Sequence, residues 1–241
     1  MEIAEYEKMY QFEERYWWWV GRRRIITGIL NKLNLDSATI LDVGCGTGIN
    51  LNHLSRYGAV IGLDSSKDAI KFCRMRGSKN VIQADAERLP FKDSIFDLIT
   101  ALDLLEHLND NKALKGFYRV LKPSGYLVLT VPAFNFMWSK HDEAVHHKRR
   151  YTKRQLKDIL EANSFIIEKV SYWNFFLFIP IVAMRLVKRS WKKQEIKTDV
   201  AELPGMVNRL LASILRIESY LIQHVNLLIG VSLVCIVRVH K

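Results

Sequence analysis

Short apolar segments alternate with amphipathic segments along most of the chain. Continuous apolar runs predict buried strands at seven places: 38–43, 59–63, 80–84, 95–101, 126–131, 165–173 and 231–239. Apolar residues at helical spacing, turn signals and one capping box predict helices at five places: 22–33, 49–56, 66–76, 110–121 and 152–162. This alternation is typical of an α/β fold, in which a doubly wound, mostly parallel sheet is covered by helices on both faces.

Two parts of the chain fall outside this alternation. Residues 1–37 begin with an acidic, aromatic segment that predicts a short helix, and we expect them to form an N-terminal helical cap. Residues 174–229 separate the last two predicted strands, and we expect them to form an apolar and basic helical insert that acts as a lid. The main domain is then expected to comprise 38–173 and 230–241.

The insert contains an apolar run over 174–184, which Pro180 interrupts and Arg185 closes. It is shorter than the roughly 20 apolar residues that span a bilayer. Residues 206–225 have the apolar spacing of an amphipathic helix. Basic residues beside apolar ones favour contact with an anionic membrane surface through 174–225. An ordinary hydrophobic lid or a dimer interface explains the same pattern equally well.

The net charge and the cysteine content indicate which partners and which cellular compartment to expect. The formal net charge of +11 favours an anionic neighbour, such as nucleic acid, an acidic lipid surface or a phosphorylated substrate, although each basic cluster could also be a solvated helix face. The three cysteines show neither metal-ligand spacing nor a disulfide framework, which fits a reducing cytoplasm. The first residues lack the apolar stretch of a signal peptide. We therefore expect a cytoplasmic protein, with contact at the inner membrane surface as a further expectation.

The segment 41–48 has the pattern of a strand that runs into a glycine-rich turn, and Asp64 follows Asp42 by 22 residues at the end of the next strand. A strand, a glycine turn, a helix, a strand and an acid together are typical of a nucleotide site. The third glycine, Gly48, comes one residue too early for the dinucleotide fingerprint. The carboxylate of Asp42 would also repel a pyrophosphate and suits a cation. S-adenosylmethionine, which carries a sulfonium and an ammonium but no phosphate, fits this loop better than a dinucleotide does.

Residues 42–48 are similar to the signature loop of class I S-adenosylmethionine-dependent methyltransferases. Further matching segments follow in the family's order, and they lie at 62–66, 83–91, 96–100, 105–108 and 121–127. The resemblance covers roughly 38–172 and is closest to the small-molecule branch, which includes quinone-biosynthesis methyltransferases. It implies a Rossmann-like methyltransferase fold with seven strands, the last of them antiparallel. The long insert between strands six and seven departs from the family's minimal pattern.

The resemblance also implies a set of residues that bind the donor. Asp42 and the loop glycines would border the methionine part, Asp64 would hold the ribose hydroxyls, and Asp85 would face the adenine amino group. Asp64 could instead cap the following helix, and Leu102 and Leu105 could either wall the site or pack in the core. The complete expected set is Asp42, Gly44, Cys45, Gly46, Gly48, Asp64, Ser65, Asp85, Ala86 and Leu102.

Methyl transfer from a sulfonium is an in-line displacement, so a base is needed only for a protonated nucleophile. The expected catalytic residues are His107, His141 and His146. His147 is a further candidate base, and Asp142 could orient one of these rings. The spacing of these histidines and acids matches no familiar zinc pattern, so we expect no metal.

The N-terminal aromatic cluster has two interpretations. One of Tyr16, Trp17, Trp18 and Trp19 could lie against the sulfonium, and one of Arg22, Arg23 and Arg24 could bind the methionine carboxylate. The tryptophans could instead only attach the first helix to the core.

We expect a methyltransferase that acts on an oxygen or carbon atom of a small or lipid-linked acceptor. The stretch 102–105 lacks the Asn/Asp-Pro-Pro-aromatic signature of nucleobase amino-group methylation. Nucleic acid is therefore not the expected partner, and the oligomeric state stays open. The alternatives are an RNA methyltransferase, a non-catalytic or membrane-associated protein that binds S-adenosylmethionine, and a dinucleotide oxidoreductase.

Overall fold

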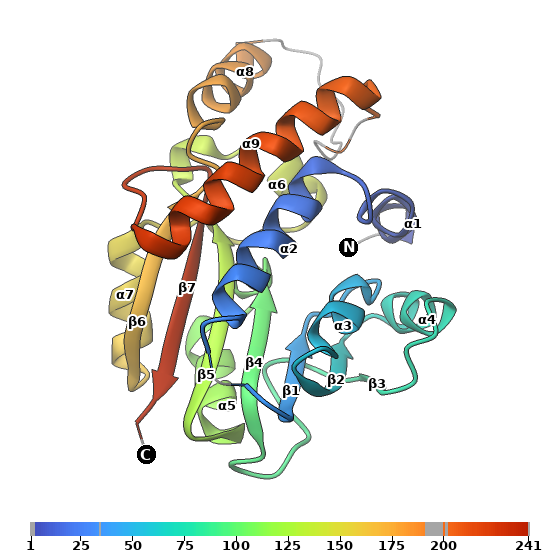
Figure 1. Ribbon diagram of the computed structural model, residues 1–241, viewed down its shortest axis with the longest axis vertical. Coiled ribbons are helices and arrows are strands. Elements are labelled where there is room, and N and C mark those ends of the chain that lie inside the picture. The colour runs from blue at the N-terminus through green and yellow to red at the C-terminus, as the bar shows by residue number, and fades with distance from the viewer. Residues whose placement is uncertain (1–2, 34, 191–199, 201, 241) are drawn as a thin grey trace.

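A seven-stranded sheet forms the middle layer of the molecule (Figure 1). The computed structural model describes residues 3–33, 35–190, 200 and 202–240. The strands are β1 (Ala38–Val43), β2 (Gly58–Asp64), β3 (Val81–Gln83), β4 (Phe96–Leu102), β5 (Leu121–Pro132), β6 (Phe165–Trp173) and β7 (Ser232–Val239). Their order is β3-β2-β1-β4-β5-β7-β6, and β7 alone runs antiparallel to its neighbours. The expected doubly wound, mostly parallel sheet is confirmed.

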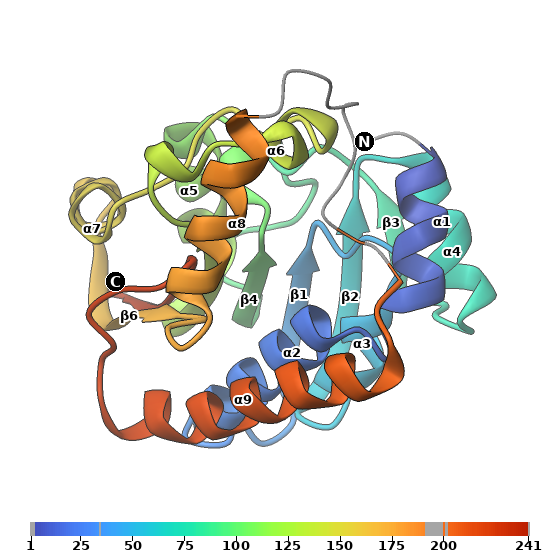
Figure 2. The ribbon, with the colours of Figure 1, turned by 90° about the horizontal axis from the view of Figure 1, so that it is seen from above.

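Helices cover both faces of this sheet (Figure 2). They are α1 (Ile3–Phe12), α2 (Trp17–Leu30), α3 (Ile49–Leu54), α4 (Lys67–Met75), α5 (Asp110–Val120), α6 (Lys140–Ala144), α7 (Lys153–Ala162), α8 (Phe178–Ser190) and α9 (Gly205–His224), with short 3₁₀ turns η1 (Leu105–His107) and η2 (Asn135–Met137). One core cluster joins α2 and α9 to one face of the sheet. A second joins α5 and α7 to the opposite face.

Some boundaries differ from the predicted ones. The first helix ends at Phe12, and α2 begins at Trp17, so the tryptophans lie inside a helix rather than ahead of it. The ring of Trp18 packs on Trp173 with centroids 4.6 Å apart, and Trp19 is buried, so the core draws the first turn of α2 inward. β5 begins at Leu121, and its pairing with β4 shifts register near Phe96.

The amphipathic helix predicted over 206–225 is confirmed as α9, which lies along α2 on a face of the sheet. Two glycines of α2 allow this close approach. A Cβ on Gly21 would lie 2.2 Å from Leu215 Cδ1, and one on Gly28 would lie 2.5 Å from Gln223 Nε2. By contrast, α8 packs beyond the carboxyl ends of β5 and β6, where Phe178 meets the core (Figure 2). Within the described ranges, no helix has both the length and the apolar character to cross a membrane.

Glu218 attaches α9 to the segment that follows β6. Its side chain is fully buried and accepts hydrogen bonds from the backbone amides of Asn174, Phe175 (2.8 Å) and Phe176 (3.3 Å). Burial raises the pKa of Glu218, while the three amides act in the opposite direction. A single carboxylate therefore satisfies three consecutive amides at the start of the insert.

Replacing this carboxylate should destabilise the fold. We expect Glu218→Ala to lower the free energy of unfolding by about 2–4 kcal/mol, because it leaves buried amides without acceptors. Glu218→Gln keeps one acceptor oxygen and should lie between Ala and the parent chain. The control is Glu161→Ala on the exposed side of α7, which should change stability by less than about 0.5 kcal/mol in urea unfolding. Equal effects at the two positions would contradict this role of Glu218.

Candidate functional site

The glycine-rich turn between β1 and α3 is held in a backbone shape that favours glycine. Gly44, Gly46 and Gly48 have φ values of 69°, 56° and 86°, in the left-handed region. The amides of Gly44 and Cys45 donate to the Leu63 carbonyl at 2.7 and 3.0 Å, which ties the turn to the end of β2. The turn therefore has a fixed shape at the carboxyl edge of the parallel strands, where ligands bind in such sheets.

Asp64 fastens this turn from the neighbouring strand. Its carboxylate accepts from the Gly46 amide at 3.0 Å and from the Ser66 amide at 2.9 Å. Burial raises the pKa of Asp64, and the backbone hydrogen bonds partly offset this effect. The N-cap of α4 is Ser66, so the alternative role of Asp64 as the helix cap is wrong. Ser65, which lies between Asp64 and Ser66 in the sequence, is exposed.

Asp42 is a buried acid, and one of its two carboxylate oxygens has no hydrogen-bond partner. Its Oδ1 accepts from Thr100 Oγ1 at 2.6 Å, and its Oδ2 has no hydrogen-bond partner. Burial raises the pKa of Asp42 to about 7, although the Thr100 hydrogen bond and the charge of Arg22 lower it. A cation placed beside Oδ2 would stabilise the ionised form.

Of the remaining residues expected to bind the donor, some lie in an exposed loop and others lie in the hydrophobic core. Asp85 is exposed after β3, and its Oδ1 accepts from the Glu87 amide at 2.8 Å, while Ala86 is buried in the core. Leu102 packs in the cluster beneath α2. Leu104 was not predicted, yet its Cδ1 would lie 2.7 Å from a Cβ on Gly44, which makes it the leucine beside the turn.

Helix α1 lies against the glycine turn. Met9 Cε would be 3.3 Å from a Cβ on Gly46, and Glu13 accepts from the Thr47 hydroxyl. Tyr6 is buried nearby, and its pKa is raised to about 12 by burial and by the charge of Asp64. Sequence reasoning missed Tyr6, because the first helix showed no pattern that pointed to a ligand.

Arg76, the C-cap residue of α4, holds α1 in this position. Its guanidinium contacts Glu13 at 2.9 Å, Glu14 at 2.7 Å and the Tyr10 carbonyl at 2.8 Å, and it lies over the Tyr10 ring at 4.3 Å. Burial raises the pKa of Glu13 to about 7 despite the neighbouring arginines.

Among the three predicted arginines, Arg22 lies deepest in this edge of the sheet. It is 7% exposed and pairs with Asp103 at 2.5 Å, directly after β4. Asp103 is also held by Thr130, whose hydroxyl donates at 2.8 Å. Arg22 is thus anchored between α2 and the end of β4.

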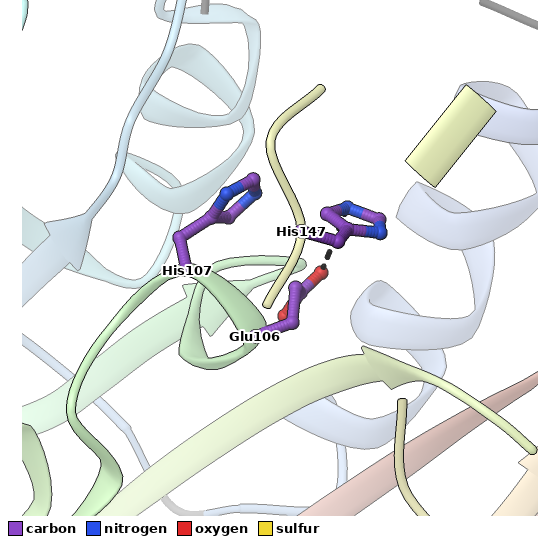
Figure 3. A group of neighbouring side chains, drawn as sticks. All are labelled: Glu106, His107 and His147. Atoms are coloured by element: carbon purple, nitrogen blue, oxygen red, sulfur yellow. Dashed lines mark ion pairs between the residues drawn. The ribbon is translucent and has the colours of Figure 1, made fainter. Parts of the chain in front are cut away.

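Two of the candidate histidines converge after β4 and β5. His107 lies in η1, and its ring is 4.9 Å from that of His147, centroid to centroid. His147 Nδ1 lies 2.8 Å from Asp142 Oδ1. On the other side of the ring, His147 Nε2 lies 3.7 Å from Glu106 Oε1 (Figure 3). Asp142 therefore orients His147.

The other two candidates lie outside this contact. His141 belongs to α6, with its ring 6.1 Å from that of His147. The side chain of His146 is exposed, and only its carbonyl reaches His107 Nδ1, at 3.3 Å.

Burial and charge set the protonation of this group. Burial, and then the charge of Asp103, raise the pKa of Glu106 well above its usual value. Burial and His147 lower the pKa of His107 to about 4. Burial alone would raise the pKa of Asp142, but the hydrogen bond from His147 and the charge of Arg150 outweigh it and lower the pKa. The donor atoms of Glu106, His107 and His147 lie within 4.8 Å of one another, close enough to be considered as metal ligands.

Comparison with known proteins agrees with this geometry. Residues 41–129 match the family described as "Methyltransferase domain". The chain is 34% identical over 107 residues to the ubiquinone biosynthesis O-methyltransferase of Xanthomonas oryzae, covering 41% of this chain and 45% of that protein. It is 32% identical over 130 residues to the tRNA (carboxymethyluridine(34)-5-O)-methyltransferase of Arabidopsis thaliana, covering 52% and 30%.

The chain spans only 40% to 63% of the length of the first curated relatives that it matches. Among solved structures, the S-adenosylmethionine-dependent methyltransferase of Mesorhizobium loti has a TM-score of 0.58 at 17% identity, covering 88% of this chain and 96% of that one. This similarity extends the shared fold well beyond residues 41–129.

The Asp42 oxygen that lacks a hydrogen-bond partner should make donor binding depend on pH. Because burial raises the pKa of Asp42 to about 7, a cationic donor must compete with a proton below that pH. We expect the affinity for S-adenosylmethionine to rise about tenfold from about pH 5.5 to pH 7 and then to level off, measured by calorimetry. Asp42→Asn should weaken binding and remove this dependence. The control, Asp93→Asn at the opposite edge of the sheet, should retain it, and a flat profile for the parent chain would contradict the role of Asp42.

Proposed function

We propose that this chain, which carries a class I S-adenosylmethionine-dependent methyltransferase domain, transfers a methyl group from S-adenosylmethionine to an oxygen or carbon atom of a small or lipid-linked acceptor. The observation that carries this proposal is the buried Asp42 carboxylate oxygen that lacks a hydrogen-bond partner, beside a fixed glycine turn. This arrangement suits the ammonium and sulfonium of the donor and disfavours a pyrophosphate, and hence a dinucleotide oxidoreductase.

The donor would lie along the carboxyl ends of β1, β2 and β3. In the proposed arrangement the methionine part borders Asp42 and the segment 44–48, the ribose borders Asp64 and Ser65, and the adenine borders Asp85 and Ala86. Since α1 lies against the turn and is attached through Arg76, we propose that it covers the bound donor. A cover of this kind excludes water from the reacting atoms.

The acceptor would enter beside Glu106, His107 and His147, at the carboxyl end of β4. These three side chains come from two segments, and the charges of Asp103 and Arg22 act on Glu106. A hydroxyl or acidic carbon must lose a proton when it attacks the methyl group, and polar side chains at this place could promote that loss. We propose this role for His107 and His147, whereas His141 and His146 are less well placed.

The apolar side chains near the carboxyl ends of these strands favour an apolar acceptor. Helix α8 packs there through Phe178, Ile181 and Val182 against Met137 and Val231. We propose that α8 is the part of the insert that borders the acceptor, as a lid. The similarity to a ubiquinone biosynthesis O-methyltransferase supports a hydrophobic substrate class.

The outward side of α9 supports contact with an anionic membrane surface. Met206, Leu210, Ile217 and Tyr220 are each more than 60% exposed, and their spacing places them in one stripe along the helix, here named the outer stripe. Arg209 and Arg216 are exposed beside it, and the one acid of α9, Glu218, points inward. We propose that the outer stripe lies in the headgroup region of a membrane that contains acidic lipids.

RNA is the second candidate acceptor. The similarity to a tRNA methyltransferase and the net charge of +11 favour it. Against it stands the exposed apolar outer stripe of α9.

A screen for methylated products tests the acceptor class. The chain is incubated with radiolabelled methyl donor and cell-extract fractions, and lipid, nucleic-acid and small-molecule products are separated. We expect label in the lipid or small-molecule fraction. His147→Ala should lower turnover about 100-fold with little change in donor affinity, while His240→Ala at an exposed site should match the parent chain.

The other outcomes of the screen are distinct. Label in RNA alone would overturn the proposed acceptor class. Donor binding without labelled product in any fraction would favour a non-catalytic binding protein.

Vesicle flotation tests the membrane contact. We expect the chain to float with vesicles that contain phosphatidylglycerol and not with vesicles of phosphatidylcholine alone. Leu210→Gln combined with Ile217→Gln should reduce binding at least tenfold, because apolar area no longer enters the interface. Met75→Gln, which replaces a comparably exposed apolar side chain on α4, is the matched control. Complete recovery of the parent chain in the soluble fraction would contradict the membrane contact, and loss of a dimer in the variant would assign the stripe to self-association.

A further inference from the structure

Glu106 is fully buried, and its carboxyl group lacks a hydrogen-bond partner. Both of its oxygens are enclosed by protein without a partner, and the nearest recorded basic group, His147 Nε2, is 3.7 Å from Oε1. Burying a carboxyl group in this way is strongly unfavourable unless a donor or a cation meets it. The structure therefore points to a partner for Glu106 that comes from outside the chain.

The two neighbouring histidines each have one ring nitrogen already engaged. His147 Nδ1 lies 2.8 Å from Asp142 Oδ1, and His107 Nδ1 lies 3.3 Å from the carbonyl oxygen of His146. A carboxylate and a carbonyl only accept hydrogen bonds, so each Nδ1 carries the proton. The Nε2 atom of each ring is then left with a free lone pair. Metal-binding histidines show this arrangement, in which an outer acceptor fixes the tautomer.

We infer that Glu106, His107 and His147 form a binding site for a divalent transition-metal ion, with one carboxylate oxygen and two imidazole nitrogens as ligands. Their donor atoms lie within 4.8 Å of one another. Ligand atoms around an ion with bonds of about 2.1 Å are separated by roughly 3.3–4.2 Å, so small side-chain rotations close the site. Figure 3 shows the three side chains grouped between η1 and the segment after α6. Two imidazoles and a carboxylate favour zinc-like ions over magnesium or calcium.

Asp142 and Arg150 hold the His147 ring in its orientation. Arg150 donates to both Asp142 oxygens, from Nε at 2.8 Å and from Nη2 at 3.0 Å, and it also donates to the Ala133 carbonyl at 3.0 Å. Asp142 is thereby fixed and in turn fixes the His147 ring. The expected absence of a metal rested on sequence spacing alone, which does not show that η1 and residue 147 meet.

This site would assist the proposed methyl transfer, and that part of the inference rests on the proposed function. Three protein ligands leave a position for an oxygen atom of the acceptor, whose hydroxyl pKa falls when it is bound to the ion. The hydroxyl proton passes to solvent, an O–CH₃ bond forms as the S–CH₃ bond breaks, and the sulfonium becomes a neutral thioether. No other reactant is required.

Titration of the metal alone tests the site without any acceptor. The full chain is dialysed against a chelator and titrated with Zn²⁺ by calorimetry, and with Co²⁺ by visible absorption. We expect about one ion per chain. His147→Ala and the isosteric Glu106→Gln should each weaken binding about 100-fold, and Asp142→Asn about 10-fold. His224→Ala on the exposed side of α9 is the matched control, and circular dichroism checks that each variant folds.

The outcomes separate this inference from the proposed function. Equal Zn²⁺ affinity in the parent chain and in Glu106→Gln, or no binding at all, overturns the metal site. Donor binding is measured on the same samples. One bound Zn²⁺ in a chain that ignores S-adenosylmethionine supports the site and defeats the proposed function. Methyl transfer that a chelator leaves unchanged overturns the part of the inference in which the metal assists the reaction, and it leaves the proposed function standing.

Discussion

Several carboxyl groups are buried at the carboxyl ends of the parallel strands, and the electrostatic cost of burying them is the constraint on which the rest of the site depends. Asp42, Asp64, Glu106 and Asp142 are each at most 8% exposed. Backbone amides compensate Asp64, and Arg150 compensates Asp142. Asp42 and Glu106 instead keep oxygen atoms without a protein partner. Such unpaired buried carboxyl oxygens favour a cationic ligand over an anionic one, which is the basis of the proposed donor site.

The glycine turn could be predicted from the sequence because its determinants are local. Asp42, Gly44, Gly46 and Gly48 lie within seven residues, and each glycine has the positive φ that the turn requires. The position of α1 could not be predicted in this way. It depends on Glu13 meeting Thr47 and Arg76, which are separated from it by 34 and 63 residues and share no periodic pattern with it.

The histidines show the same contrast: the sequence identifies the residue types, whereas long-range contacts decide where the side chains lie. The sequence indicated a group of candidate bases and favoured His107, His141 and His146, but it could not show which of the rings lie together. His146 has a positive φ, and the backbone around it turns so that His147 faces Asp142 while the His146 side chain faces solvent. The insert is a parallel case. The apolar spacing of α9 predicted a helix, but its place against α2 depends on Gly21 and Gly28, which leave room for it.

The position of β7 has a consequence for how the chain acquires its structure. This strand is the last of the seven in sequence, yet it lies between β5 and β6 rather than at an edge. β6 lies at the edge of the sheet and pairs with β7 alone among the described strands, so it has no strand to pair with until residues 232–239 have been synthesised. During translation the earlier strands can assemble, whereas β6 and the insert after it must wait, with apolar surface exposed in the meantime. Completion of the sheet is thus a late, long-range event in the biogenesis of this protein.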